Sequence, residues 1–212
     1  MNLTRLFKPK TIAVIGGGAW CESIMSAAHQ IGYEGTILPV HPSGKKIAGV
    51  KSLKSLDAFP GLIDAAFVGV NRHATLDIVT QLRTLNAGGA TCFASGFSEA
   101  AAEDASGVSL QKKLVKAAGE MPILGPNCYG FLNAFDKCGI WPDQHGCREV
   151  DQGVAILTQS SNIAINITMQ NRGLPIGYVI ACGNQAQTSQ ADVAIHLLND
   201  PRITSIGLHI EG

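Results

Sequence analysis

Residues 11–18 read Thr-Ile-Ala-Val-Ile-Gly-Gly-Gly, a short apolar run that ends in three consecutive glycines. The run has the length and the β-branched content of a buried strand. A helix face follows it, because apolar residues recur at helical spacing at Ile24, Ala27, Ala28 and Ile31. Glycine at a strand-to-helix turn lets backbone N–H groups approach a phosphate. The stretch therefore predicts strand, turn and helix, and the turn is either a phosphate site or a plain tight turn.

The alternation of strand and helix continues along the first part of the chain. Further strands are predicted at residues 36–40, 65–70, 90–94 and 122–124, with helices within 78–85 and 110–118. Short connections between such elements give right-handed βαβ units and a parallel sheet that helices cover on both faces. We therefore predict an α/β fold with a Rossmann-like doubly wound domain over residues 1–130.

A second and shorter series of elements lies after residue 150. Residues 131–150 show no periodicity, and we interpret them as a crossing segment. Strands are then predicted at 154–158, 176–181 and 203–210, with a helix face at 193–198. Residues 162–170 alternate as a strand would, but neighbouring parallel strands need a crossover, so we predict a helix there. Residues 151–212 are therefore predicted to form a partial α/β domain, which is small for a unit that folds independently.

The composition argues against several classes of partner. Of the 212 residues, 46% are hydrophobic and 15% are charged, and 16 lysines and arginines balance 16 acidic residues. This balance offers no basic footprint for nucleic acid, and no apolar run reaches the roughly 18 residues that suggest a membrane span. The six cysteines form no C-x-x-C pair and follow no secretory signal, which indicates reduced thiols in the cytoplasm. Because Cys128, Cys138, His145 and Cys147 match no common zinc spacing, no metal is expected.

Polar loops follow the predicted strands at the carboxyl edge of the sheet, where open α/β folds bind ligands. Residues 41–46 read His-Pro-Ser-Gly-Lys-Lys and lack the acidic residue that NAD binding uses. This basic loop suits a ligand with an extra phosphate, such as NADP or coenzyme A (CoA), and the alternative is a solvated turn. The other such loops are Asn71-Arg72, Ser95-Gly96-Phe97 and Pro126-Asn127-Cys128.

The second series ends its strands in the same way. Residues 158–162 read Thr-Gln-Ser-Ser-Asn and open the predicted helix, so their side chains are either N-caps or part of an anion site. Gly183 and Asn184 close the next strand, and Glu211 follows the last one. The sequence holds no nucleophile elbow, P-loop or zinc-protease motif.

Taken in order, these loops resemble one family, the nucleoside-diphosphate-forming acyl-CoA synthetases, which include the succinyl-CoA synthetase α subunit. The most specific shared motif is Gly125-Pro126-Asn127-Cys128-Tyr129-Gly130. The resemblance covers essentially the whole chain and includes Ile12–Gly18, Gly35–Pro42, Ser95–Glu99, Gln159–Ser161, Gly183–Asn184 and Ile210–Gly212. It implies a Rossmann-like CoA-binding domain followed by a partial flavodoxin-like ligase domain.

The resemblance also implies roles for individual residues. CoA would be bound by Gly16, Gly17, Gly18 and Trp20 at its phosphates, by Pro42 and Lys45 beside the 3′-phosphate, by Asn71, Ser95, Gly96 and Phe97 along the pantetheine, and by Asn127 and Cys128 near the thiol. A phosphate would be bound by Ser160, Ser161, Asn162, Gly183 and Asn184. Glu211 would be the catalytic residue that holds the family's phosphorylated histidine.

In the family, a carboxylic acid is joined to CoA while a nucleoside triphosphate becomes diphosphate and phosphate. An acyl phosphate forms first, CoA thiolate then displaces the phosphate, and a histidine carries the phosphoryl group to an ATP-grasp domain. The resemblance therefore implies ATP or ADP and Mg²⁺ only through an ATP-grasp domain, in the same chain or in a separate subunit. A homo-oligomer is possible.

The sequence departs from the family pattern at some positions. Ser161-Asn162-Ile163 stands where Ser-Gly-Ala is usual, and Trp20-Cys21 replaces polar residues in a shortened glycine loop. The family histidine lies beyond Glu211, so we expect this chain to be the first part of a longer enzyme that binds CoA but is inactive alone. The alternatives are a CoA- or nucleotide-sensing module without catalysis and, more weakly, an NADP oxidoreductase.

Overall fold

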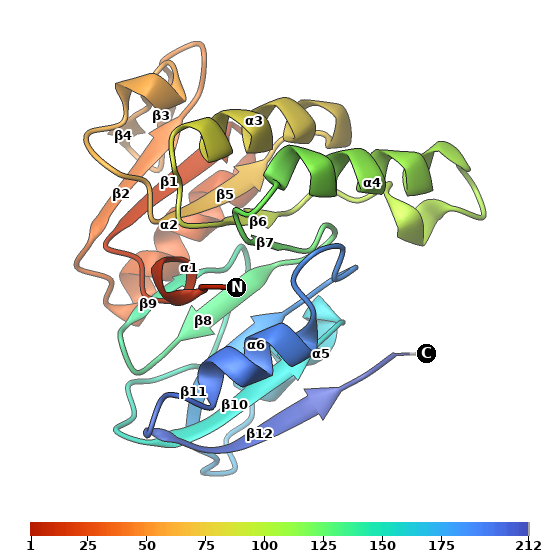
Figure 1. The fold of residues 1–212 in the computed structure, drawn as a ribbon. Helices are drawn as coiled ribbons and strands as arrows, with labels where there is room; N and C mark the ends of the chain where they lie inside the picture. The colour runs from red at the N-terminus through yellow and green to blue at the C-terminus, as the bar shows by residue number, and fades with distance from the viewer. Residues whose placement is uncertain (212) are drawn as a thin grey trace.

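The computed structural model describes residues 1–211, and Gly212, the last residue of the Ile210–Gly212 motif, lies outside the described residues. Two five-stranded sheets make up most of the molecule, one above the other in Figure 1. The first sheet has the strand order β2-β1-β5-β6-β7, and all its pairs are parallel. Its strands are β1 (Thr11–Gly16), β2 (Thr36–Val40), β5 (Ala65–Gly69), β6 (Ala90–Cys92) and β7 (Ile123–Leu124). The predicted doubly wound parallel sheet is confirmed.

Helices cover both faces of this sheet because residues of β1 alternate between two apolar cores. Ile12 and Val14 pack with α2 (Ala19–Ile31), whereas Ala13 and Ile15 belong to the core under α3 (Arg72–Thr84) and α4 (Ser106–Ala118). The glycine turn at the end of β1 leads straight into α2, as the sequence predicts. Short elements complete this part: α1 (Thr4–Phe7), β3 (Lys46–Ile47), β4 (Val50–Lys51), η1 (Leu56–Ala58) and η2 (Ser98–Ala100).

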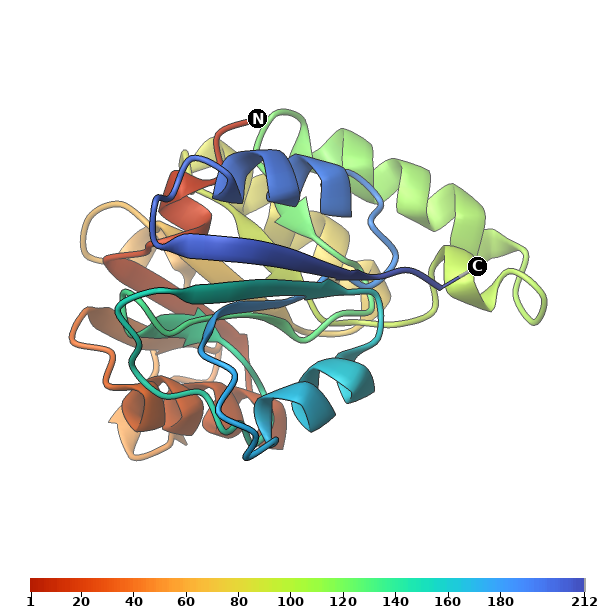
Figure 2. The ribbon, with the colours of Figure 1, turned by 90° about the horizontal axis from the view of Figure 1, so that it is seen from below.

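The second sheet is mixed and has the order β12-β10-β11-β8-β9. Its parallel strands are β10 (Gly153–Thr158), β11 (Ile176–Ala181) and β12 (Ile203–His209). Helices α5 (Ser161–Thr168) and α6 (Gln190–Leu197) lie on opposite faces of the sheet, as Figure 2 shows. The prediction of a crossover helix at 162–170 is therefore confirmed.

One part of the chain differs from the sequence interpretation. Residues 131–150 were expected to form a crossing segment, but the structure places β8 (Gly130–Asn133) and β9 (Cys138–Ile140) there as an antiparallel hairpin. β8 pairs with β11, so the hairpin completes the second sheet. Strands of three and four residues are too short to show a period in the sequence.

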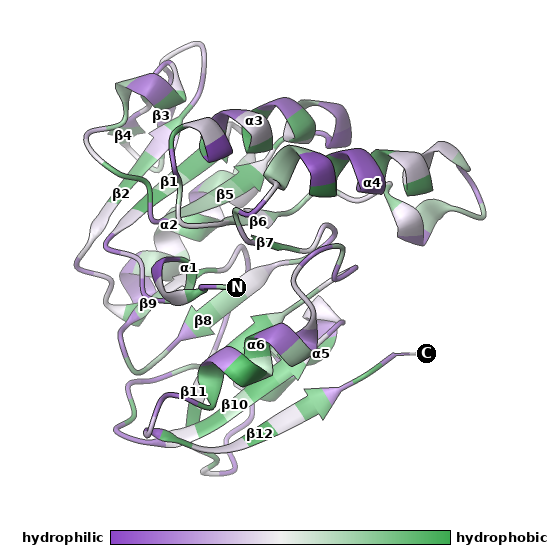
Figure 3. Cartoon of the chain, in the orientation of Figure 1, coloured by the Kyte–Doolittle hydropathy of each residue, from purple (hydrophilic) through white to green (hydrophobic). Residues whose placement is uncertain are grey.

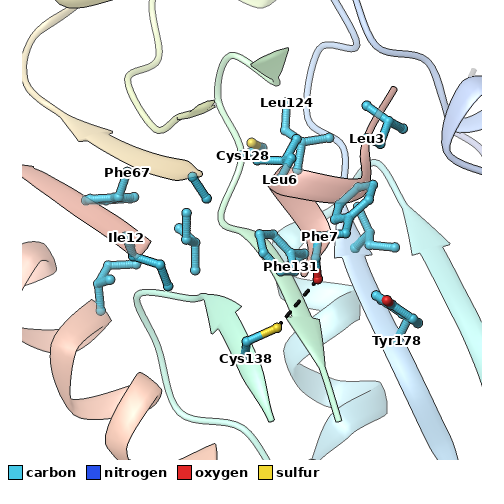
Figure 4. Close-up of a cluster of buried hydrophobic side chains, with 14 of the residues drawn as sticks. Leu3, Leu6, Phe7, Ile12, Phe67, Leu124, Cys128, Phe131, Cys138 and Tyr178 are labelled. Carbon is cyan, nitrogen blue, oxygen red and sulfur yellow. Dashed lines mark hydrogen bonds between the residues drawn. The ribbon is translucent and has the colours of Figure 1, made fainter. Parts of the chain in front are cut away.

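The two sheets share one hydrophobic core, which is drawn in Figure 4. Phe7 of α1 lies within it, with its ring centroid 5.1 Å from that of Phe131 on β8 and 6.3 Å from that of Tyr178 on β11. The Asn133 side-chain amide donates to the Phe7 carbonyl at 3.0 Å and to the Tyr178 hydroxyl at 2.8 Å. Figure 3 shows apolar residues concentrated on the strands, with polar positions recurring along α3 and α4.

The loop after β11 fastens the second sheet to the end of the first. The N–H groups of Asn184 and Ala186 donate to the carbonyls of Pro126 and Gly125, each at 2.9 Å. The Gln187 side chain accepts from the Ile123 N–H at 2.9 Å and donates to the Gly119 carbonyl at 2.7 Å. The carboxyl ends of the two sets of strands are thereby held in a fixed relation. Within residues 1–211, no helix combines the length and apolar character needed to cross a membrane.

Phe7→Ala tests whether one core stabilises both sheets. Phe7 is fully buried, so its truncation is expected to lower the free energy of unfolding by about 3–5 kcal/mol. Chemical denaturation followed by circular dichroism and by tryptophan fluorescence measures this, and both probes are expected to shift together. Leu198→Ala is the control, since Leu198 is 70% exposed and its loss is expected to cost less than about 0.5 kcal/mol. Separate transitions for the two probes would contradict a shared core.

Candidate functional site

A cleft of about 760 Å³ opens where the carboxyl ends of the strands of both sheets meet. This is the edge at which open α/β folds bind ligands. Loops after β5, β6 and β7 form one side, and the start of α5 forms the other. The lining residues include Trp20, Asn71, Ser95, Asn127, Cys128, Ser160, Ser161, Asn162 and Glu211. The structure thus brings together residues that the sequence analysis placed in two separate domains.

The glycine turn borders a second hollow of about 400 Å³, lined by Gly16, Gly17, His41, Pro42 and Lys54 among others. Gly16 has a φ of +129°, and a Cβ atom there would lie 2.5 Å from the Gly69 carbonyl oxygen. The Lys45 ammonium donates to the Gly17 carbonyl at 2.5 Å. Gly69 and Val70 line both this hollow and the cleft, so the two cavities adjoin.

Gly18 is exposed and precedes the first turn of α2 without a side-chain cap. The first N–H groups of a helix have no intrahelical acceptor, so this turn can receive an anion. Lys45 and Pro42 are also exposed; Lys45 donates to the neighbouring Gly17 carbonyl, and Pro42 lines the same hollow as Gly17. The structure therefore gathers the glycine turn and the basic loop at one place.

Asn71 and Arg72 hold the start of α3. The Asn71 side-chain oxygen accepts from the N–H groups of His73 and Ala74 at 3.1 and 3.0 Å. The Arg72 guanidinium donates to the Gly96 carbonyl at 2.7 Å and to Asp104 at 2.6 Å. Hydrogen bonds from Ser106, together with this ion pair, lower the pKa of Asp104 to about 2. Asn71 and Ser95 both line the cleft.

Phe97 is placed differently from the other residues expected along the pantetheine. Its side chain is fully buried in the core beneath α3 and α4 and does not line the cleft. The neighbouring Gly96 has a φ of +90° and donates its N–H to the Glu99 carboxylate at 2.6 Å. Ser95 is therefore the residue of this loop that lines the cleft.

Asn127 and Cys128 occupy the loop after β7, which follows a cis Gly125–Pro126 bond. Asn127 has a φ of +56° and is exposed, whereas Cys128 is 1% exposed. Burial raises the pKa of the Cys128 thiol well above its usual value. Cys128 therefore stays a neutral thiol at physiological pH and packs at the base of the cleft.

The second sheet contributes the N-terminus of α5. The Ser160 hydroxyl accepts from the Ile163 N–H at 3.4 Å, and the Thr158 hydroxyl accepts from the Ser160 N–H at 3.0 Å. Ser161 and Asn162 form the first turn and line the cleft. The Ser160 side chain is therefore an N-cap of α5, and an anion site at this helix end stays a prediction.

Glu211 lies where the cleft meets a smaller hollow of about 450 Å³. Its N–H donates to the Gln159 side chain, and its carboxylate is 4.0 Å from Nδ1 of His209. Gly183 and Asn184 line the smaller hollow, and the Asn184 amide donates to the Glu99 carboxylate and to Gln111. The expected phosphate-binding residues thus lie around two adjoining cavities.

Phe93 and Tyr129 also line the cleft, although the sequence analysis gave them no site role. Phe93 lies just after β6 and Tyr129 just before β8. Tyr129 stands inside the Gly-Pro-Asn-Cys-Tyr-Gly motif, which was the only signal for it in the sequence. Within residues 1–211, no group of three or more His, Cys, Asp or Glu side chains is arranged to hold a metal ion.

A family model described as a CoA binding domain matches residues 10–134, which is more than half of the chain. The chain belongs to the CoA binding domain family. A second model, a succinyl-CoA ligase like flavodoxin domain, matches residues 151–212. The resemblance to the nucleoside-diphosphate-forming acyl-CoA synthetases is thereby confirmed.

Relatives of this CoA binding domain chain are much longer than the chain itself. It is 29% identical to the trans-feruloyl-CoA synthase FCS1 of an unknown prokaryotic organism, over 99% of this chain and 31% of the relative. It is 28% identical to the α subunit of an ADP-forming acetate–CoA ligase II of Pyrococcus furiosus, over 99% of this chain and 46% of the relative. The chain therefore spans about a third to a half of these relatives.

Solved structures show the same fold. The dinucleotide-forming acetyl-coenzyme A synthetase 1 of Candidatus Korarchaeum cryptofilum matches all of this chain with 46% of its own length, at 25% identity and a TM-score of 0.87. That enzyme has also been solved in complex with phosphate and ADP, with the same TM-score of 0.87. The arrangement of the two sheets in this chain is therefore shared with about half of that solved chain.

The protonation of Cys128 can be tested by alkylation. At about pH 8.5 an ordinary cysteine is half ionised, but burial keeps Cys128 neutral and shielded. We expect iodoacetamide to leave Cys128 unmodified in the native protein and to modify it in urea, as read by peptide mass spectrometry. Fast modification of the native protein at Cys128 would instead indicate an accessible thiolate.

Proposed function

We propose that this chain forms the CoA-binding and phosphate-handling part of an ADP-forming acyl-CoA synthetase, which joins a carboxylic acid to CoA. The observation that carries this proposal is the single cleft lined by loops of both sheets. A CoA-binding family match on one side and a ligase-like match on the other support it. Such a cleft allows the acid, a phosphoryl group and a thiol to meet.

CoA fits the hollow beside the glycine turn. Gly16 and Gly17 leave the turn without side chains, and a Cβ at Gly17 would lie 2.5 Å from the His41 ring. Lys45 and Lys54 supply positive charge beside this hollow, which suits the 3′-phosphate better than a ribose hydroxyl. Because Gly69 and Val70 line both cavities, a chain leaving this hollow can continue toward Asn127. When bound, CoA supplies the thiol that accepts the acyl group.

The phosphoryl side of the reaction belongs to the α5 end of the cleft. Ser160, Ser161 and Asn162 present hydroxyl, amide and helix N–H donors there. Donors fixed in place stabilise charge that moves during phosphoryl transfer. Glu211, beside them, would accept a hydrogen bond from the histidine that carries the phosphoryl group. Cys128, as a buried thiol, would shape the base of the cleft without acting as a nucleophile.

The remaining parts of the reaction would come from elsewhere in the enzyme. ATP or ADP with Mg²⁺ would be bound by an ATP-grasp domain, in the same polypeptide or in a separate subunit. The cysteines of this chain are all free, which supports a cytoplasmic location. The relatives are named for trans-ferulate and for acetate, so the identity of the acid has to be argued from the cleft itself.

Lys45→Glu tests the position of CoA. Removing a cation beside the 3′-phosphate and placing an anion there is expected to weaken CoA binding by about tenfold or more. The affinity for dephospho-CoA, which lacks that phosphate, is expected to change less than about twofold. Isothermal titration calorimetry measures both ligands.

The control for this test is Lys113→Glu, an equal charge change at an exposed position on α4. It is expected to leave both affinities unchanged. If the wild-type chain binds no CoA at millimolar concentration, the proposed function is wrong. Equal losses of affinity for CoA and dephospho-CoA in Lys45→Glu would show that Lys45 does not contact the 3′-phosphate.

A further inference from the structure

Three aromatic side chains from distant parts of the chain form one wall of the cleft, here called the aromatic wall (Trp20, Phe93 and Tyr129). The ring centroid of Trp20 is 5.2 Å from that of Phe93 and 6.1 Å from that of Tyr129. Phe93 and Tyr129 are 5.8 Å apart. These separations are those of rings in mutual contact, so the three side chains form a continuous apolar surface.

Buried aromatic residues support this wall from behind. Phe93 contacts Phe67 at a centroid distance of 5.4 Å, and Tyr129 contacts Trp141 at 5.7 Å. Phe67 and Trp141 are both fully buried. The wall is therefore held in place by the core. A ligand that binds to it has to order few side chains, so the entropic cost of binding is small.

Trp20 is the exposed end of this surface. It is the second residue of α2 and has 45% of its surface accessible to solvent, while Phe93 and Tyr129 are half-buried. The wall faces a cleft of about 760 Å³, within the range of small-molecule sites. An aromatic surface in such a cleft gains most from a flat ring that can stack on it.

The cleft has two chemically different sides. The α5 end carries the polar groups of Ser160, Ser161 and Asn162 together with helix N–H donors. A carboxylic acid that reacts with a phosphoryl group must place its carboxylate at that end. The rest of the acid then lies in the cleft that the aromatic wall borders.

We infer that the aromatic wall binds the ring of an aromatic carboxylic acid, whose carboxylate points toward the start of α5. The inference rests on the proposed function, because it assigns the acid of that reaction. In the proposed function the phosphates of CoA lie in the hollow beside Lys45 and its pantetheine reaches the cleft near Asn127, so the thiol and the acid meet in this cleft. A short aliphatic acid would leave the aromatic wall in contact with water.

Ligand-observed saturation-transfer NMR tests this with 3-phenylpropanoate and, as the non-aromatic counterpart, propanoate. We expect saturation transfer to the ring protons of 3-phenylpropanoate and at least tenfold weaker binding of propanoate. Tyr129→Ala is expected to weaken 3-phenylpropanoate binding at least fivefold, and Tyr129→Phe, which keeps the ring, is expected to retain most of it. Leu198→Ala truncates a distant exposed side chain, 70% accessible on the end of α6, and is expected to change nothing.

Calorimetry with CoA on the same variants separates this inference from the proposed function. If CoA binds and 3-phenylpropanoate does not, the aromatic-acid assignment fails while the proposed function stands. Equal binding of the two acids, or no effect of Tyr129→Ala, would also overturn the assignment. A loss of CoA affinity in Tyr129→Ala as large as the loss for the acid would place Tyr129 in the CoA site instead. Retained CoA binding with a selective loss of the aromatic acid supports the inference.

Discussion

The packing of Phe7 between the two sheets is the contact on which the rest of the structure depends. Phe7 belongs to a helix of only four residues, yet it meets Phe131 of β8 and Tyr178 of β11 in the second sheet. The same helix contacts β5 of the first sheet, and Phe7 shares a core with Phe67 of that strand. Because these contacts make one core of two sheets, the sheets cannot rotate against each other without exposing that core. The cleft at their carboxyl ends is therefore a property of the fold and does not depend on a ligand to form it.

The cleft and the hollow that adjoins it combine three kinds of surface, each produced by a different local structure. A glycine turn with Lys45 gives a positively charged edge, the start of α5 gives fixed hydrogen-bond donors, and Trp20, Phe93 and Tyr129 give a flat apolar side. In the proposed function, a phosphate, a moving phosphoryl group and an organic acid would each use one of these surfaces. Because the surfaces lie close together, the proposal can bring these three groups into contact.

The parallel strands and the helix at 162–170 could be predicted because buried strands and crossover helices follow from the connectivity alone. The hairpin β8–β9 could not, since its strands are short and their pairing with β11 is a long-range contact. The same limit applies to the site. The loops at strand ends were predicted as a group, but the burial of Phe97 and the meeting of Phe93 with Trp20 depend on how the side chains pack.

Gln187 shows how a single side chain can end a sheet. β7 lies at the edge of the first sheet, and its Ile123 N–H would otherwise be open to pairing with a foreign strand. The Gln187 amide accepts from that N–H and donates to the Gly119 carbonyl, so it imitates one peptide group of an additional strand. The connection between the two sheets thus also protects the first sheet against edge-to-edge aggregation.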